Sequence, residues 1–241
     1  MKKINLLIAL ALSLGIASCN NGSDKTATAE TKDTATTTAA APIKTSPTLP
    51  MDVLIIYHTV KDYNQWKQGF DTDSVARLAS GLSFIALEKS ADKPNDVKIV
   101  FAVSDLGKAK SFIADPRLKE AMEKAGVISN PITNFWSIIR NNKENQKAGD
   151  TRVEIVHKVK DFGVWLKGFD AEGPATRAAN GMNDMVLGRG VDDSNMVHVV
   201  FDITDLAKAK ARLANPALKK IMEDAGVIGV PSIKIYIDAS K

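Results

Sequence analysis

The second half of this chain repeats the first, and the duplication constrains the fold more than any other feature. Residues 54–71 return 99 positions later and residues 77–131 return 100 positions later. Over these two ungapped blocks 34 of 73 aligned positions are identical, which is too many for chance. We therefore predict two domains of one fold, in residues 51–139 and 151–239, joined by a polar linker over residues 140–150.

Each copy predicts the order strand, helix, strand, strand, helix, strand. Helix N-cap and C-terminal signals recur at equivalent positions of the two copies: Asp62 and Asp161, Asp105 and Asp205, Asp115 and Asn215, Gly126 and Gly226. The first of these caps follows a β-rich run in each copy. This order is that of the ferredoxin-like α+β unit, an antiparallel sheet with helices on one face.

The strands of the first copy are apolar on both faces, so its sheet needs a second partner. We assign Leu54, Ile56 and His58 to the helix-covered face. The opposite face of the first copy carries Val53, Ile55, Tyr57, Val100, Trp136 and Ile138. Such a surface is too apolar to be left in water. We expect it to meet the sheet of the second copy, so that one chain forms a pseudo-dimeric α/β barrel.

Three sequence patterns occur in both copies: Val-x-Asp-aromatic-x-x-Trp-x-x-Gly-Phe-Asp, Val-Phe-x-x-x-Asp-Leu-x-Lys-Ala-Lys and Pro-x-Leu-x-x-x-Met-x-x-Ala-Gly-Val. They resemble the dimeric α/β-barrel superfamily, to which antibiotic biosynthesis monooxygenase-like proteins belong. The resemblance covers nearly the whole of both copies and implies the barrel fold. Its implication for activity is weak, because the superfamily includes cofactor-free monooxygenases, haem-degrading enzymes and isomerases.

Residues 1–18 resemble a bacterial lipoprotein signal peptide. Lys2 and Lys3 precede an apolar run, and Ile16-Ala17-Ser18-Cys19 stands as the lipobox around the single cysteine. The resemblance implies that Cys19 is lipidated and anchors the protein in the bacterial cell envelope, periplasmic or surface-exposed. An ordinary secretory signal is the alternative. Residues 19–50 have few large aliphatic side chains and predict a flexible tether or a glycosylated stalk.

The composition limits the partners. Without residues 1–18 the chain has 30 basic and 28 acidic residues, which gives no case for nucleic-acid binding. We expect a monomer whose partners are the membrane, through Cys19, and a small molecule. A lipidated cysteine excludes thiol catalysis in the mature protein. Three histidines make an unconvincing metal set, and no cofactor or metal is expected.

Two conspicuous residue pairs are interpreted as structural. His58 and His157 are equivalent and stand among aliphatic residues, so we expect buried rings bonded to backbone near the following helix cap. Arg177, like its equivalent Arg77, could bind an anion, but Asp170 stands nearby and an ion pair between them is expected instead.

The two copies differ most at the positions expected to face the barrel. Where the first has Val53 and Ile55, the second has Arg152 and Glu154. Such an interior suits an amphipathic ligand with its apolar body against Tyr57 and Trp136 and its polar end toward the charged side. The candidate ligand-binding residues are Tyr57, Lys98, Trp136, Glu154, His198 and Tyr236. The alternative is that the charges pair with one another across the interface.

Three functions remain open, and no catalytic residue is assigned. The first is an envelope lipoprotein whose barrel binds a small apolar or amphipathic molecule. The second, on the resemblance alone, is a cofactor-independent monooxygenase-type enzyme. The third is a protein-interaction module of the envelope, which predicts a large apolar patch outside the barrel. A barrel packed solidly with side chains would exclude the first function.

Overall fold

The computed structural model describes residues 48–72, 74–142 and 150–240, and residues 46–241 form one compact unit. The predicted signal peptide, Cys19, nearly all of the tether and most of the linker lie outside the described residues. The first repeat contains β1 (Met51–Thr59), α1 (Tyr63–Thr72), α2 (Ser74–Ala79), β2 (Leu82–Ser90), β3 (Asp96–Val103), α3 (Leu106–Ile113), α4 (Pro116–Lys124) and β4 (Ile132–Asn141). The second contains β5 (Thr151–Val159), α5 (Phe162–Glu172), α6 (Pro174–Ala179), β6 (Met182–Gly190), β7 (Met196–Ile203), α7 (Leu206–Leu213), α8 (Pro216–Asp224) and β8 (Val227–Asp238).

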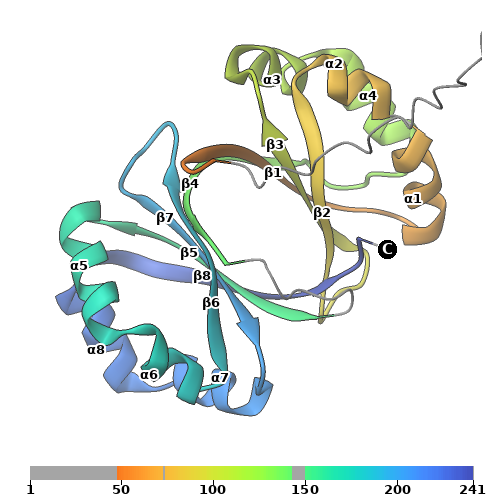
Figure 1. The fold of residues 1–241 in the computed structure, drawn as a ribbon. Coiled ribbons are helices and arrows are strands. Elements are labelled where there is room, and N and C mark those ends of the chain that lie inside the picture. Colours follow the sequence, from red (N-terminus) through yellow and green to blue (C-terminus); the bar gives the residue numbers. More distant parts are fainter. Residues whose placement is uncertain (1–47, 73, 143–149, 241) are drawn as a thin grey trace, which may run out of the picture. The chain divides into compact units, whose positions relative to one another are not determined.

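The strands of both repeats close into a single barrel in the order β1-β3-β2-β8-β5-β7-β6-β4 (Figure 1). All pairings between these strands are antiparallel. The repeats join at two seams, where β2 pairs with β8, with Glu88 opposite Asp238, and β4 pairs with β6, with Ile138 opposite Gly188. The predicted α+β fold, with two ferredoxin-like repeats forming an internal pseudo-dimeric barrel, is confirmed.

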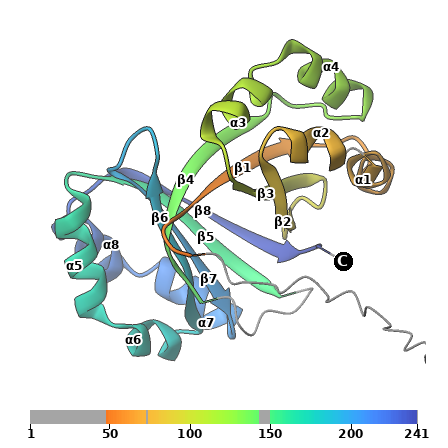
Figure 2. The same ribbon diagram turned by 45° about the horizontal axis from the view of Figure 1, so that its top comes forward.

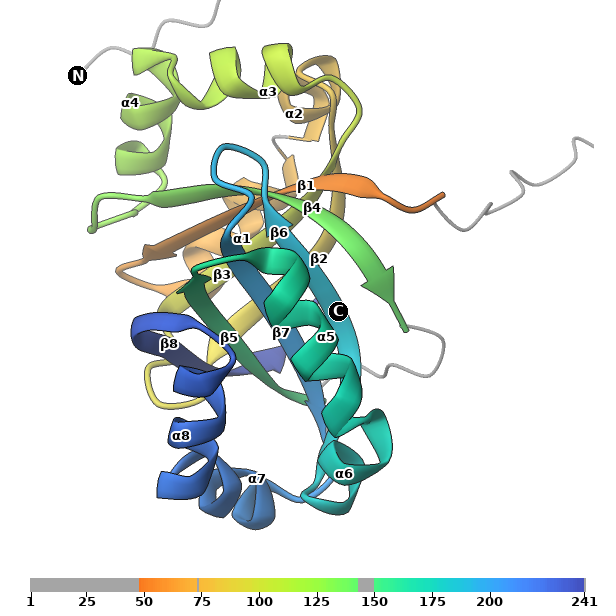
Figure 3. The same cartoon turned by 90° about the vertical axis from the view of Figure 1, so that its left-hand side faces the viewer.

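The helices cover the outside of the barrel. Figures 2 and 3 show α1 to α4 on the strands of the first repeat and α5 to α8 on those of the second. On the helix side of β1, Leu54 is fully buried and Ile56 is nearly so, and both pack with Trp66 of α1. Val153 and Trp165 belong to the matching core of the second repeat. The face assignment made from strand alternation is therefore correct.

The inner face of the barrel has a core of its own. Val53, Ile55, Trp136 and Ile138 form a buried cluster, against which Val156, Val186 and Met196 of the second repeat pack. Side chains of the second repeat thus help to bury the apolar sheet face of the first, which could not be left in water. This cluster fills only part of the barrel interior.

The predicted caps are present. The side chain of Asp62 accepts a hydrogen bond from the backbone N–H of Gln65 at 2.8 Å, and Asp105 accepts one from Lys108 at 3.0 Å. Asp115 and its equivalent Asn215 cap α4 and α8 in the same way. Each such cap satisfies one N–H that the first helical turn would otherwise leave unpaired.

One short helix in each repeat was not predicted. In the second repeat it is α6, which begins at Pro174 after Gly173, whose φ of 80° ends α5. Arg177 ties this helix down, because its Nη1 donates to the carbonyl of Phe169 at 2.8 Å. The expected ion pair of Arg177 with Asp170 is wrong: its carboxylate partners are Asp184, at 2.6 Å, and Glu172.

A β-bulge interrupts the second strand of each repeat. In β2 the register shifts between Phe84 and Ala86, and in β6 between Asp184 and Val186. Phe84 pairs with Phe101 on the helix side, but beyond the bulge Glu88 pairs with Lys98 on the barrel side. An extra residue in one strand reverses the facing of all residues that follow it. The bulge therefore turns Glu88 into the barrel.

Candidate functional site

The six candidate residues meet inside the barrel around the carboxylate of Glu154 on β5. Glu154 Oε1 lies 2.7 Å from Lys98 Nζ and 2.7 Å from His198 Nε2. It also accepts a hydrogen bond from the hydroxyl of Tyr57 at 3.1 Å. Three donors from β1, β3 and β7 thus converge on one oxygen. The divergent positions of the two copies come together in space, as strand alternation predicts.

The aromatic candidates pack against the same centre. The ring of Trp136 stacks on that of His198, with centroids 5.0 Å apart and planes inclined by 27°. Lys98 Nζ lies 4.9 Å from the ring centroid of Tyr236, close enough for a cation–π interaction. These contacts fix the orientation of the imidazole and the ammonium.

Further charges extend the cluster. Lys98 Nζ also lies 2.8 Å from Glu88, whose other carboxylate oxygen is 2.6 Å from Arg152 Nη1. The Nη2 of Arg152 in turn contacts Asp238 at 2.5 Å. Except for Asp238, these side chains are no more than 3% exposed. We call Glu88, Lys98, Arg152, Glu154, His198 and Asp238 the barrel network.

Neighbouring groups hold Glu154 and Lys98 in their charged forms despite burial. Burial acts to raise the pKa of Glu154, but Lys98 and His198 outweigh burial and hold that pKa at about 2. Burial likewise acts to lower the pKa of Lys98, and Glu154 and Glu88 outweigh it, so the pKa is raised. Burial, reinforced by Glu154, raises the pKa of Tyr57 well above its ordinary value. At neutral pH a carboxylate and an ammonium thus face a protonated phenol.

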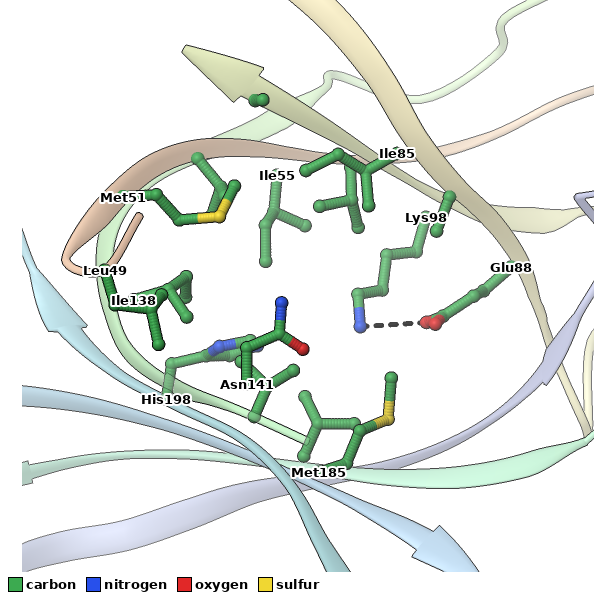
Figure 4. A pocket seen from close by; sticks show the side chains of 16 residues that line it. Leu49, Met51, Ile55, Ile85, Glu88, Lys98, Ile138, Asn141, Met185 and His198 are labelled. Atoms are coloured by element: carbon green, nitrogen blue, oxygen red, sulfur yellow. Dashed lines mark ion pairs between the residues drawn. The ribbon is translucent and has the colours of Figure 1, made fainter. Parts of the chain in front are cut away.

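A cavity of about 660 Å³ adjoins the barrel network, whose members Glu88, Lys98 and His198 form part of its lining (Figure 4). Its polar side chains are Glu88, Lys98, Asn141 and His198. The other lining residues are apolar: Leu49, Met51, Val53, Ile55, Ile85, Ala86, Val100, Ala102, Ile138, Met185, Val186 and Val200. The interior is therefore not solidly packed, and the cavity has apolar walls with charged groups at one side.

The cavity differs from the expected one in how apolar and charged groups are divided. Of the six candidates only Lys98 and His198 line it. Tyr57 and Tyr236 line a second hollow of about 670 Å³ that also includes Lys234. The expected division of the interior into an oily first copy and a charged second copy is wrong, because both repeats contribute to the apolar walls and both contribute to the network.

Glu88 was missed as a member of the site. Strict alternation from Leu82 and Phe84 places it on the helix side, and only the bulge turns it inward. The pairing of β2 with β3 could have predicted this position, because aligning Leu87 with Ile99 places Glu88 beside Lys98. A carboxylate buried against the helices would also have lacked a cation, which argues against strict alternation.

The two equivalent histidines lie outside the barrel, between sheet and helices. His58 and His157 are each 5% exposed, and each packs edge-on against a tryptophan with ring centroids 5.3 Å apart. The predicted backbone hydrogen bonds are absent: neither ring nitrogen of either residue has a partner among the described residues. Burial lowers the pKa of both rings to about 4, so both are neutral at physiological pH.

Each of these histidines lines a cleft beneath the helices, and the clefts differ in size. The cleft at His157 has a volume of about 400 Å³, and the one at His58 about 220 Å³. Phe112 lines the smaller cleft, whereas its equivalent in the larger one is Arg212, which pairs with Glu172. The cleft at His157 is larger because Arg212 stands in place of a phenylalanine ring and its side chain is directed toward Glu172.

The described ranges contain neither a cluster of metal-ligating side chains nor a helix that could span a membrane. No three His, Cys, Asp or Glu side chains there converge as a metal site. No helix in these ranges is long and apolar enough to span a membrane.

Comparison with known proteins identifies the fold. No protein-family model matches the chain, and no curated protein matches it. A solved structure described as an anthrone oxidase-like protein has a TM-score of 0.53 at 12% identity, covering 79% of this chain and 92% of that one. Another, described as a candidate monooxygenase from Fusobacterium nucleatum subsp. nucleatum, has a TM-score of 0.52 at 12% identity, covering 80% and 94%. The chain therefore has the fold of the dimeric α/β barrels, with both halves supplied by one polypeptide.

Proposed function

We propose that the barrel interior binds a small amphipathic molecule. One observation carries the proposal: a cavity of about 660 Å³ whose walls are apolar and whose charged groups are gathered at one side. Ligand sites of folded proteins are commonly about 300 to 1,000 Å³, mostly apolar, with a few fixed polar groups. The barrel network supplies such groups already held in place by ion pairs.

Native mass spectrometry of the protein purified from its own host tests this proposal. A co-purified small molecule is expected, and Ala102→Trp, which places a large ring among the lining residues, should abolish its retention. Val75→Trp, at a position that is 76% exposed, is the matched control and should leave it bound. If the wild-type protein carries no molecule and also binds no amphipathic probe, the barrel is not a binding site.

We also propose that the protein is a monomeric lipoprotein of the bacterial envelope, anchored through Cys19. The support is the lipobox-like sequence Ile16-Ala17-Ser18-Cys19 at the end of residues 1–18, together with a barrel completed within one chain. Metabolic labelling of the host with an alkynyl fatty acid should label the wild-type protein and not Cys19→Ser. Membrane association of an unlabelled Cys19→Ser protein at the wild-type level would contradict lipid anchoring.

A second candidate function is catalysis of the cofactor-independent oxygenase type, in the cleft at His157. The observation that favours it is a neutral imidazole without a hydrogen-bond partner among the described residues, placed at an apolar cleft of about 400 Å³. Such a ring can accept a hydrogen bond from a bound phenolic substrate. Oxygen uptake with polyphenolic substrates, lost in His157→Leu, is the expected result. Absence of turnover across the panel would remove this candidate.

A further inference from the structure

In the described part of the chain, three buried polar atoms without a hydrogen-bond partner belong to side chains that line the barrel cavity; one of them, Glu88 Oε2, has Lys98 Nζ at 2.8 Å as its ion-pair partner, and the other two have no such contact. His198 Nδ1 and Asn141 Oδ1 are both buried and have no hydrogen-bond partner among the described residues. His198 and Asn141 both line the cavity, and Figure 4 shows both side chains reaching into it. A buried polar atom without a partner is costly, and such atoms are commonly satisfied by a ligand or by ordered water.

The barrel network decides what His198 can offer. Glu154 is ionised, because its pKa is held at about 2, so its oxygens can only accept hydrogen bonds. At 2.7 Å from Glu154 Oε1, Nε2 of His198 must therefore carry the hydrogen. The other ring nitrogen, Nδ1, has no partner among the described residues, so a partner for it must come from the cavity side.

The remaining polar groups at the cavity disfavour an anion. Three carboxylates of the barrel network, Glu88, Glu154 and Asp238, face two cations, Lys98 and Arg152. A ligand carboxylate or phosphate would add a fourth negative charge beside these buried carboxylates. Lys98 has three N–H donors and lies at ion-pair distance from two carboxylates, so a donor remains for a neutral oxygen of a ligand.

We infer that the barrel ligand is a neutral amphiphile whose polar end is a hydroxyl group. The hydroxyl donates to His198 Nδ1 or Asn141 Oδ1 and accepts from Lys98, while the apolar body lies along Ile55, Ile138 and the other apolar walls. This inference rests on the proposed binding function and names the chemistry that the same cavity selects.

Three straight-chain probes of similar length test the inference on the full chain: 1-octanol, its methyl ether 1-methoxyoctane, and octanoate, each displacing the neutral fluorescent amine N-phenyl-1-naphthylamine. The methyl ether can accept a hydrogen bond but cannot donate one. We expect 1-octanol to bind about tenfold more tightly than the ether, the worth of one buried hydrogen bond. Octanoate should bind at least about tenfold more weakly than 1-octanol, because burying an unpaired charge costs more than losing a hydrogen bond.

His198→Leu removes one acceptor and should reduce the preference for 1-octanol over the ether to about twofold or less, while the ether still binds. His58→Leu removes an equally buried imidazole outside the barrel and should leave the preference unchanged. Asn141→Leu gives a second, independent measurement if His198→Leu does not fold. Ala102→Trp should prevent binding of all three probes, which places them in the barrel.

The results separate this inference from the proposed function. If all three probes bind equally well, or if octanoate binds best, the cavity binds amphiphiles but does not select a hydroxyl, and the inference is wrong. If neither the dye nor any probe binds, both proposals fail. A preference that survives His198→Leu and Asn141→Leu together would also overturn the inference.

Discussion

Replacing Lys98 by methionine measures what holds the barrel network together. Lys98 Nζ lies 2.8 Å from Glu88 and 2.7 Å from Glu154, and all three side chains are nearly inaccessible to solvent. Methionine keeps the length of the side chain and removes its charge, so two carboxylates would remain buried without their shared cation. Removal of one partner from a buried ion pair typically costs about 3 to 5 kcal/mol. For a compact unit of this size that corresponds to a fall in Tm of roughly 6 to 20 °C.

The control is an exposed ion pair of equal length. Lys110 Nζ lies 2.6 Å from Asp192, but the two side chains are 43% and 71% exposed. Exposed pairs of this kind contribute less than about 1 kcal/mol because water screens them. Urea unfolding, followed by far-UV circular dichroism, should therefore show a large fall in midpoint for Lys98→Met and a small one for Lys110→Met. The slope of the transition should be unchanged in both.

The cost of Lys98→Met should depend on pH, and the sign follows from Glu154. In the wild-type protein the pKa of Glu154 is about 2, below its ordinary value of 4.5, so its stabilising effect is present above pH 4.5 and is lost as the pH falls toward 2. In the variant burial acts with less opposition and raises that pKa. Protonation of Glu154 then removes an unpaired buried charge from the variant. The difference in unfolding free energy between the variant and the wild type should therefore shrink as the pH is lowered from 7 to 4.

Two results would refute this reasoning. One is a cost of Lys98→Met no larger than that of Lys110→Met, which would mean that water reaches the barrel network. The other is a difference between variant and wild type that stays constant from pH 7 to pH 4. His58 and His157 lie outside the barrel and are the same in both proteins, so their titration cancels in the comparison.

Three further predictions concern the scaffold. Gly181→Ala should destabilise the folded protein by more than about 2 kcal/mol, because φ is 75° and the new Cβ would lie 2.5 Å from the carbonyl oxygen of Asp205. The control is Gly173→Ala, where φ is 80° but the space around the new Cβ is open, and it should cost only about 1 to 2 kcal/mol. Asp161→Ala removes the cap of α5 and should cost about 1 kcal/mol by urea unfolding, whereas no loss would show that the cap is dispensable. His58 and His157 have pKa values of about 4 when folded and 6.5 in the ordinary state, so the unfolded chain binds protons first and stability should fall between pH 6.5 and 4, by roughly 3 kcal/mol per ring. NMR titration of either ring near pH 6.5 in the folded protein would contradict this last prediction.

The fold could be predicted because its signals are local and occur twice. Asp105 and Asp205 each stand before a helix, and each accepts a hydrogen bond from a backbone N–H three residues later. Strand alternation separated Leu54 from Ile55 correctly, because a strand buried on both faces still points successive side chains in opposite directions. The short helices α2 and α6 were missed, since Arg177 anchors α6 through contacts to Phe169, Glu172 and Asp184 that no periodicity reveals.

The sequence predicted most of the residues that form the site but not which of them pair with one another. Divergence between the copies picked out Glu154 and His198, because positions that face a shared interior need not be alike in two fused halves. Which groups pair, however, depends on distances across the barrel. The bulge in β2 brings in Glu88, and the pairing of Tyr57 with Glu154 removes that ring from the role of an apolar wall.

The barrel network explains why two fused, unlike copies differ from a dimer of identical ones. Lys98 is equivalent to His198, Glu88 to Gly188, and Ile55 to Glu154. A symmetric dimer of the first repeat would place two Lys98–Glu88 pairs in the barrel and no imidazole. A symmetric dimer of the second would bury two copies of Glu154 and two of His198 without the lysine that holds the pKa of Glu154 down. Gly188 is also required where β6 meets β4, because a Cβ there would lie 2.8 Å from Ile138 Cδ1 and 2.9 Å from the carbonyl oxygen of Ser137. Duplication on one chain allows one half to supply Lys98 and Glu88 and the other to supply Glu154 and His198, so an off-centre ionised cluster forms and leaves the rest of the interior apolar.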